Sequence, residues 1–456
     1  MLNARNIMRS PAVPSAVLLY GIIFLFAGTY FSKVPWQRAY TVALYLSVSV
    51  WSATVVFQRF GRHRSSFNRI DLLFSIFLLA ILLSSAINWW DGTAEYFKMM
   101  PVFILVPYAL GRVMLGKDGY LLRNILIGMG ILLLPLIFTE YLRVLQYGLP
   151  YSNSPNPTLF GLGHGVMLSG VLLSATFLSL TSALLSPDDT RSPLGMSSPS
   201  GRLISYVTLA VIIVTMGWIA PRGSVVAAIP AVASLFMLSP KSASKQKRQI
   251  LLVIALALAI ATAHTLLRKE STEFYSAILN PPVLDENTTG KALVSSTGTK
   301  QMMSILGNEA CETIVDSVSD RWVHYRQALA LFLSKPIFGA GANQYGAYAC
   351  TGPGSFPHST VLQVFAELGA SVGLVYCILV WKTFRVLLRS RERISELAAE
   401  SLWAWFASFF LMQFLFAQLS GNYFLSAGMY YFFGIAANAL DQDAGAVRGS
   451  RPCTSW

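Results

Sequence analysis

Charged residues are scarce in this sequence. Lys, Arg, Asp and Glu make up 12% of its 456 residues, against 54% hydrophobic residues. An ordinary soluble domain carries about twice that share of charge, so the composition excludes one. A spanning helix needs about 20 apolar residues. Runs of that length predict an all-α polytopic membrane protein with about twelve transmembrane helices, at 13–31, 40–58, 70–89, 97–115, 121–140, 160–186, 203–220, 224–239, 250–267, 360–381, 400–418 and 422–439.

Acidic residues are the rarer charged class. The chain has 34 Lys and Arg against 21 Asp and Glu, a net charge of +13. No basic, aromatic-interleaved soluble module accompanies that charge, so nucleic-acid binding is not expected. With a cytoplasmic N-terminus, 22 of the 34 basic residues fall in the inside breaks and 12 outside, which agrees with the positive-inside rule. Both termini are therefore predicted to be cytoplasmic.

A small-residue cleavage site is also missing after the first apolar segment, so 13–31 is predicted to be a retained span and not a signal peptide. The inside basic residues gather in the breaks 59–69, 241–248 and 382–393. The predicted organisation follows from these spans. It comprises nine spans in 1–267, a large periplasmic loop in 268–357, three spans in 358–440 and a cytoplasmic tail in 441–456.

The loop from Arg268 to Pro357 is long enough that a function is expected of it. Its first half, near 281–299, is rich in Asn, Thr, Gly and Ser and is predicted to be irregular. Its second half predicts a capped helix over Arg321 to Ser334. The expected apolar positions of that helix are Trp322, Tyr325, Leu329 and Phe332, and the residues that end it are Lys335, Pro336, Gly339 and Gly341.

Cysteine is rare, with four in the chain, and two of them, Cys311 and Cys350, fall in this loop. In an oxidising periplasm these two could pair, which would stabilise the loop by about 3 to 4 kcal/mol on a chain-entropy model. Two unpaired thiols are the alternative. Of the others, Cys377 falls in a predicted span and Cys453 in the tail.

Histidine is scarce too, and one of the five stands apart by its position. His358 lies where the long loop ends and a helix begins, in the run from Pro357 to Thr360. The partial positive charge of a helix N-terminus disfavours imidazolium, and a neutral imidazole can accept a proton. We therefore predict that His358 is a general base. The alternative is an interfacial residue beside the helix cap.

Three arginines are candidates for binding phosphate. Arg222 lies in a very tight outside turn between two predicted spans, where charge is costly and usually functional. Its planar fork suits phosphate oxygens, although a snorkelling Arg at the headgroups is an equal alternative. Arg321 and Arg326 share the loop helix but lie about 140° apart around it, so only one of the two needs to face a phosphate.

Metal-ligand spacing is absent among the His, Cys and carboxylate residues, so no essential metal is expected. The run Asp441, Gln442, Asp443 is similar to the DxD motif of metal-dependent sugar transferases. It falls in the predicted tail, where we expect solvated residues.

The stretch from Asp320 to Leu374 resembles the signature region of bacterial O-antigen ligases, O-antigen polymerases and related oligosaccharyltransferases. Outside this stretch the resemblance extends to the layout of spans, long loop and outside Arg. The matching residues are Arg321, Ala328, Leu329, Pro336, Gly339, Gly341, His358, Leu362, Glu367, Gly369 and Gly373.

The resemblance implies a GT-C-like fold and transfer of a glycan from undecaprenyl pyrophosphate at the periplasmic face of the bacterial inner membrane. Among these families the chain is most similar to an O-antigen ligase, whose acceptor is the outer core sugar of lipid A-core. The essential His of the family corresponds to His358, its loop Arg to Arg321 and its other Arg to Arg222. Where an Asn often follows the His, this sequence has Ser359.

From this we expect metal-independent, inverting displacement without a cofactor. His358 would be the base, and Arg222 and Arg321, with Arg326 available, would bind the pyrophosphate. Glu367 lies about 180° around an ideal helix from His358, so we predict packing or polar pairing for it. An O-antigen polymerase is the nearest alternative. A lipid-linked glycan transporter is disfavoured because the predicted spans carry few ionisable residues.

Overall fold

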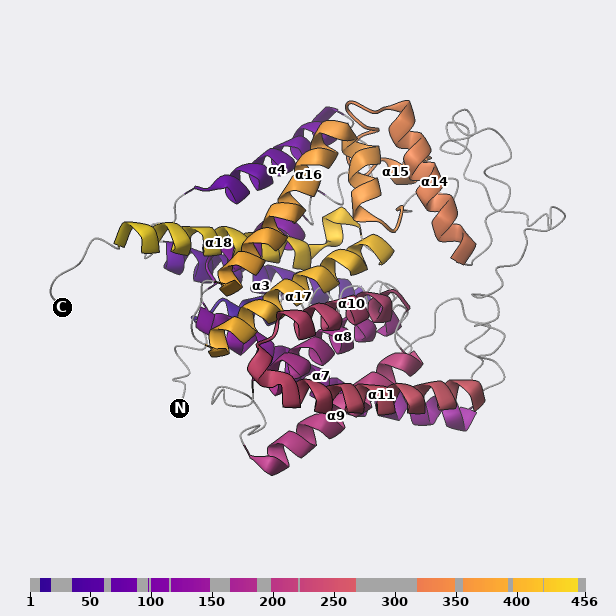
Figure 1. The fold of residues 1–456 in the computed structure, drawn as a ribbon. Coiled ribbons are helices and arrows are strands. Elements are labelled where there is room, and N and C mark those ends of the chain that lie inside the picture. Colours follow the sequence, from indigo (N-terminus) through magenta and orange to yellow (C-terminus); the bar gives the residue numbers. More distant parts are fainter. Residues whose placement is uncertain are drawn as a thin grey trace.

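The computed structural model describes residues 9–17, 35–60, 67–87, 97, 100–114, 116–147, 165–186, 198–219, 222–267, 318–348, 356–392, 397–420 and 422–449. Within these ranges the regular elements are all helices (Figure 1). They are α3 (Pro35–Phe60), α4 (Arg69–Ile87), η2 (Pro101–Leu105), α6 (Val106–Arg112), α7 (Gly116–Tyr147), α8 (Gly165–Leu184), α9 (Pro199–Ile219), α10 (Arg222–Leu238), η4 (Lys241–Ala243), α11 (Ser244–Leu267), α14 (Val318–Ser334), α15 (Tyr345–Tyr348), α16 (Thr360–Glu392), α17 (Leu397–Ser420), η6 (Tyr423–Leu425) and α18 (Ala427–Gly449).

The chain is a multi-pass helical membrane protein. Five segments in the described ranges are long and apolar enough to cross a membrane: Arg69–Ile87, Pro199–Met216, Ser244–Ala263, Thr360–Arg391 and Glu400–Leu419. Three shorter apolar helices accompany them, at Pro101–Arg112, Val171–Leu184 and Val225–Leu238. The count of twelve spans and the large periplasmic loop stay predictions, because most of 13–31, all of 268–317 and 349–355 lie outside the described residues.

The helices divide into a buried centre and a lipid-facing edge. In Figure 1, α16, α17 and α18 lie at the centre of the bundle, whereas α9 and α11 lie together at its lower edge. The central helices bury large aromatic side chains, including Trp405, Tyr376 and Tyr430. On α11, by contrast, Leu252 and Leu256 are exposed, as expected for a helix that faces acyl chains.

Glycines allow one very close helix pair. A Cβ built on Gly111 of α6 would lie 2.0 Å from the carbonyl oxygen of Tyr431, and one on Gly434 of α18 would lie 2.1 Å from that of Tyr108. Small residues at helix crossings let backbones approach where lipid offers no hydrophobic driving force. This contact joins α6 to α18 and thereby brings the buried charges of the two helices together.

An ionic cluster ties the first turns of α4 to the ends of α6 and α18. Arg112 pairs with the carboxylates of Asp71, at 3.0 Å, and Asp441, and Tyr108 donates to Asp71 at 2.5 Å. Nearby, Arg59 pairs with Asp118 at 2.7 Å. The prediction that Asp441 belongs to a solvated tail is therefore wrong. It lies inside α18, because pairing with a buried guanidinium extends the helix past the end of its apolar run.

The loop helix forms where the sequence predicts it, with a different face buried. The prediction was Arg321 to Ser334, and α14 runs from Val318 to Ser334. Leu329, one of the apolar positions expected from the sequence, is 50% exposed. The buried side chains lie one position away, because the inner face of α14 is partly polar and an apolar pattern cannot reveal it. They are His324, Gln327, Ala328 and Leu331.

Candidate functional site

A loop docks into a break in α16. The helix is interrupted at Gly369, where φ is 80° and ψ is 179°. An interruption leaves helical carbonyl and N–H groups without their usual partners. The loop after α14 supplies new ones: the N–H groups of Ala340 and Gly341 donate to the carbonyls of residues 366 and 367, at 2.9 and 2.8 Å, and Ala370 N–H donates to Pro336 at 2.8 Å.

Glycine is required on both sides of this contact. A Cβ on Gly369 would lie 2.1 Å from the carbonyl oxygen of Ile337, and a Cβ on Gly339 would lie 2.3 Å from that of Glu367. Both glycines also have positive φ, which L side chains rarely adopt. The loop and the broken helix therefore fit only as a backbone-to-backbone pair.

The break bends α16 back on itself. A Cβ on Gly373 would lie 2.6 Å from the ring of Phe365. In a straight helix, eight residues rise about 12 Å, and side chains lean toward the N-terminus, so this contact could not occur. The first turns of α16, 360–368, are thus a separate segment packed against its long spanning part, and they lie beside α14 and α15 (Figure 1).

Glu367 lies at the centre of this arrangement and is fully buried. Its carboxylate accepts four hydrogen bonds, from the N–H groups of Asn343 (2.6 Å) and Tyr345 (3.1 Å), from Gln363 Nε2 (3.2 Å) and from the Tyr423 hydroxyl (2.8 Å). All four donors are uncharged. The predicted role of Glu367 in polar pairing is seen here: it joins the docked loop to α16 and η6.

Tyr345 connects the docked loop to α14 through its hydroxyl. Its hydroxyl lies 2.9 Å from Nδ1 of His324, and it also contacts the His324 carbonyl at 3.1 Å and Gln327 Oε1 at 3.2 Å. Burial lowers the pKa of His324 below its ordinary value of 6.5, because the charged ring would lose its hydration. Burial therefore disfavours the charged form of His324, and the Tyr345 contacts restrain its ring.

His358 lies against that ring. The two imidazoles meet edge to face with centroids 5.5 Å apart, and the ring of Phe356 also packs against His358, with centroids 4.6 Å apart. The backbone of His358 has a φ of 57°. Non-glycine residues seldom take this conformation and keep it only where their surroundings hold them, which is most common at functional sites.

The next residue fixes the helix start behind His358. Ser359 caps the helix, since its carbonyl accepts from Gln363 N–H at 2.9 Å and its hydroxyl from Leu362 N–H at 3.4 Å. The Ser359 hydroxyl also donates to Gln418 Oε1 of α17 at 2.9 Å. Ser359 is therefore the N-cap residue of α16.

Gln418 joins three helices at this point. Its side-chain Nε2 donates to Thr360 Oγ1 at 2.6 Å. Its backbone carbonyl oxygen accepts from the Tyr325 hydroxyl of α14 at 3.3 Å. With the Ser359 contact, these bonds fix the start of α16 against both α17 and α14. His358 is therefore anchored through its neighbours on two sides.

The predicted site residues are placed to different extents. Arg222 begins α10 and Arg321 belongs to α14, but their side chains lie outside the described residues, as do Cys311 and Cys350. Arg326, also on α14, is exposed. In the described part of the chain no three His, Cys, Asp or Glu residues lie close enough together to hold a metal ion. Reaction without a metal stays a prediction.

Sequence reasoning missed His324, Tyr345 and Gln418. A signal for the first was present, because His324 and Gln327 are spaced three residues apart on a helix and so share a face. Polar residues at that spacing on a half-buried helix indicate partners from elsewhere. Tyr345 and Gln418 carry no such signal, since their contacts depend on how the loop docks.

A comparison with known families agrees with this region. Residues 206–378 match the family model described as O-Antigen ligase. The matched range includes α10, α14, the docked loop and the first half of α16, and hence Arg222, Arg321 and His358. The predicted resemblance to the O-antigen ligase family is confirmed over this range. No curated protein matches the chain.

Proposed function

We propose that this multi-pass membrane protein, whose residues 206–378 match the O-antigen ligase family, attaches a lipid-linked glycan to lipopolysaccharide. The family match supports O-antigen ligase or polymerase activity in general. The finer proposal is that the donor is a glycan on undecaprenyl pyrophosphate, that the acceptor is the outer core sugar of lipid A-core, and that transfer occurs on the periplasmic face of the bacterial inner membrane.

The observation that carries this proposal is the placement of His358. It has a left-handed backbone just before α16, and its ring packs against those of Phe356 and His324. Its Nδ1 atom is buried, and the residue as a whole is only partly buried. A nitrogen base held rigidly at a helix N-terminus suits proton abstraction.

The proposed reaction is a single displacement. The acceptor hydroxyl loses its proton to His358 and its oxygen attacks the anomeric carbon. The bond from that carbon to the pyrophosphate breaks with inversion, and the electron pair leaves with the phosphate. Arg222 and Arg321, with Arg326 as the alternative on α14, would stabilise the developing negative charge. The donor's own phosphate linkage supplies the energy, so neither a metal nor a cofactor is invoked.

The buried polar contacts behind the site support this role by limiting motion. Glu367 fixes Tyr345, Tyr345 fixes His324, and His324 packs on His358. A general base acts efficiently only when it is held within hydrogen-bond reach of its substrate. We propose that Glu367, Tyr345 and His324 are positioning residues for His358.

The test uses purified full-length protein, lipid-linked glycan and lipid A-core, with EDTA present. Transfer is expected in wild type, and His358→Ala is expected to lose it by about 10² to 10⁴-fold, the usual contribution of a general base. Arg391→Gln, a change in a partly buried ion pair of a different region, is the matched control. Wild-type transfer by correctly inserted His358→Ala would refute the proposal.

An O-antigen polymerase is the second candidate, because the same match supports it. Omission of lipid A-core separates the two. A ligase leaves the donor unchanged without its acceptor, whereas a polymerase lengthens lipid-linked chains.

A further inference from the structure

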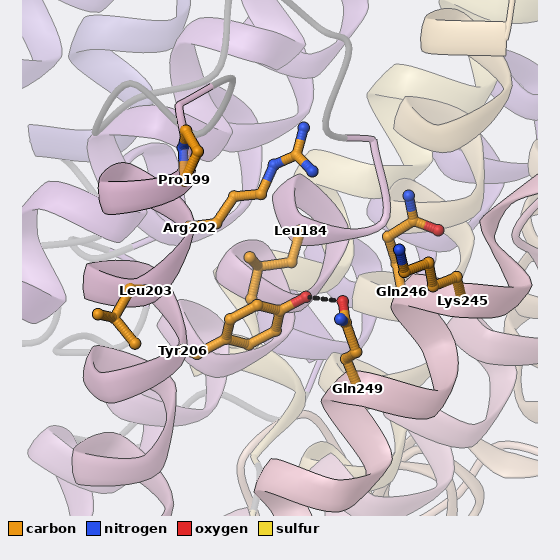
Figure 2. Close-up of a pocket in the computed structure, with 8 residues that line it drawn as sticks. All are labelled: Leu184, Pro199, Arg202, Leu203, Tyr206, Lys245, Gln246 and Gln249. Atoms are coloured by element: carbon orange, nitrogen blue, oxygen red, sulfur yellow. Dashed lines mark hydrogen bonds between the residues drawn. The ribbon is translucent and has the colours of Figure 1, made fainter.

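A cavity of about 450 Å³ lies between the first turns of α9 and α11, beside the end of α8 (Figure 2). Two of its lining residues are cations from different helices, Arg202 of α9 and Lys245 of α11. Among the residues that the structure describes, no carboxylate lines it. The cavity is therefore a positively charged recess and is suited to an anion.

A second feature of the lining also indicates a ligand. Gln246 contributes its side chain to the cavity, and its Oε1 atom is buried without a hydrogen-bond donor among the described residues. A buried acceptor without a donor is costly, so it favours a ligand that carries one. Beside it, the Tyr206 hydroxyl donates to Gln249 Oε1 at 3.0 Å and holds α9 against α11.

The apolar part of the lining distinguishes a lipid from a free anion. Leu203 lines the cavity and is 65% exposed. Beyond the cavity, the same two helices continue with exposed apolar side chains, Val207 and Val211 on α9 and Leu252 and Leu256 on α11. A lipid would cover both the cavity, with its charged headgroup, and the exposed apolar side chains beyond it, with its acyl chains. A free phosphate would cover only the cavity.

We propose that this cavity binds an anionic glycerophospholipid. Arg202 and Lys245 contact the phosphate, Gln246 accepts from a headgroup hydroxyl, and the acyl chains lie along α9 and α11. Basic recesses between helices are known sites for such headgroups. The cavity lies at the end of the bundle predicted to be cytoplasmic, away from His358, so this site is independent of the proposed transfer reaction.

The test measures lipid binding to delipidated full-length protein by native mass spectrometry. Phosphatidylglycerol is titrated against phosphatidylcholine, and inorganic phosphate serves as competitor. We expect phosphatidylglycerol to bind more tightly than phosphatidylcholine. Arg202→Gln and Lys245→Gln should each raise its Kd about fivefold, and the double variant about 25-fold, from the usual contribution of a basic residue at a lipid surface.

Arg248→Gln is the matched control, because Arg248 is exposed on α11 three residues after Lys245 and does not line the cavity. Its Kd should equal that of wild type. Equal binding of the two lipids by wild type, or an unchanged Kd in the double variant, would overturn the site. Displacement of phosphatidylglycerol by an equal concentration of inorganic phosphate would show a free-anion site and overturn the assignment to a lipid.

Discussion

The two ends of the bundle hold their buried carboxylates in different ways. Asp71 and Ser84 lie on α4, 13 residues and about 20 Å apart, and mark the two ends. At the first end, Asp71 is paired with the guanidinium of Arg112. At the second, Ser84 accepts from Ala342 of the docked loop, and Glu367 is held by four uncharged donors.

The difference shows how the two ends use positive charge. At one end guanidinium groups neutralise buried carboxylates, and at the other end the buried carboxylate is held by uncharged groups. Carboxylates at the first end bind guanidinium groups directly, so their charge is neutralised within the protein. At the loop end the described partners of Glu367 are backbone, amide and phenol groups, with no guanidinium among them. Under the proposed function, the positive charge of the arginines at that end then serves the pyrophosphate of the donor.

The largest stability effect is expected at the ionic end. Arg112→Leu leaves the buried Asp71 and the partly buried Asp441 without this cation, which should cost about 3 to 5 kcal/mol of unfolding free energy. Arg391→Leu removes a single partly buried pair, in which Arg391 and Glu400 are each 23% exposed, and should cost less. Detergent-titration unfolding checks both. Equal losses would mean that the Arg112 cluster contributes no more than this single pair.

The next largest loss of stability is expected at the break in α16. Gly369→Ala should cost about 1 to 3 kcal/mol from backbone strain alone, with the clash against Ile337 added, and should reduce transfer because the loop can no longer dock. Gly128 of α7 is the matched control, because a Cβ there meets nothing within 4 Å.

Gly128→Ala should stabilise its helix by about 0.5 to 1 kcal/mol and leave transfer unchanged. A Gly369→Ala protein that is stable and fully active would show that the docked loop does not position the site.

Removal of the Tyr345 hydroxyl gives a smaller effect. Tyr345→Phe leaves His324 and Gln327 without a buried partner, which should cost about 1 to 3 kcal/mol. We expect kcat to fall more than KM changes, because His358 loses its support. Tyr206→Phe, which removes an exposed hydrogen bond, is the control and should leave kcat unchanged. The same kcat in both variants would remove Tyr345 from the positioning set.

The smallest effect is a pH dependence. Because burial lowers the pKa of His324 below 6.5, the folded protein resists protonation of this ring, and stability is lost as the pH falls through 6.5. His324→Gln should flatten this acid limb while Tyr345 keeps a hydrogen-bond partner. Melting curves at a series of pH values test the sign. An acid limb that is unchanged in His324→Gln would assign it to another group.

Much of the architecture could be predicted because lipid leaves so few choices. Apolar runs predicted where the long apolar helices lie, since backbone groups in a bilayer must be satisfied within a helix, but the predicted ends of α16 and α18 fall at residues 381 and 439, well before Glu392 and Gly449. The prediction failed at Asp441, where a charge partner on α6, distant in sequence, extends α18. Periodicity within one segment carries no information on such partners.

The site was predictable in part. His358 could be located because a loop end beside a helix start is visible in sequence, and the matching glycines are explained by the docking of 336–341 into α16. The inner face of α14 could not be predicted, because His324 and Gln327 take partners from other segments, Tyr345 among them. Polar burial depends on tertiary partners and leaves no apolar stripe.

The most direct measurement of the central claim is the transfer rate of His358→Ala with and without added imidazole, across a pH series. If His358 is the base, the variant should be slow, and imidazole should raise its rate increasingly as the pH rises and the added base loses its proton. Gly369→Ala, which keeps the base but loses the docked loop, should not respond. Transfer by His358→Ala at the wild-type rate without imidazole would contradict the account.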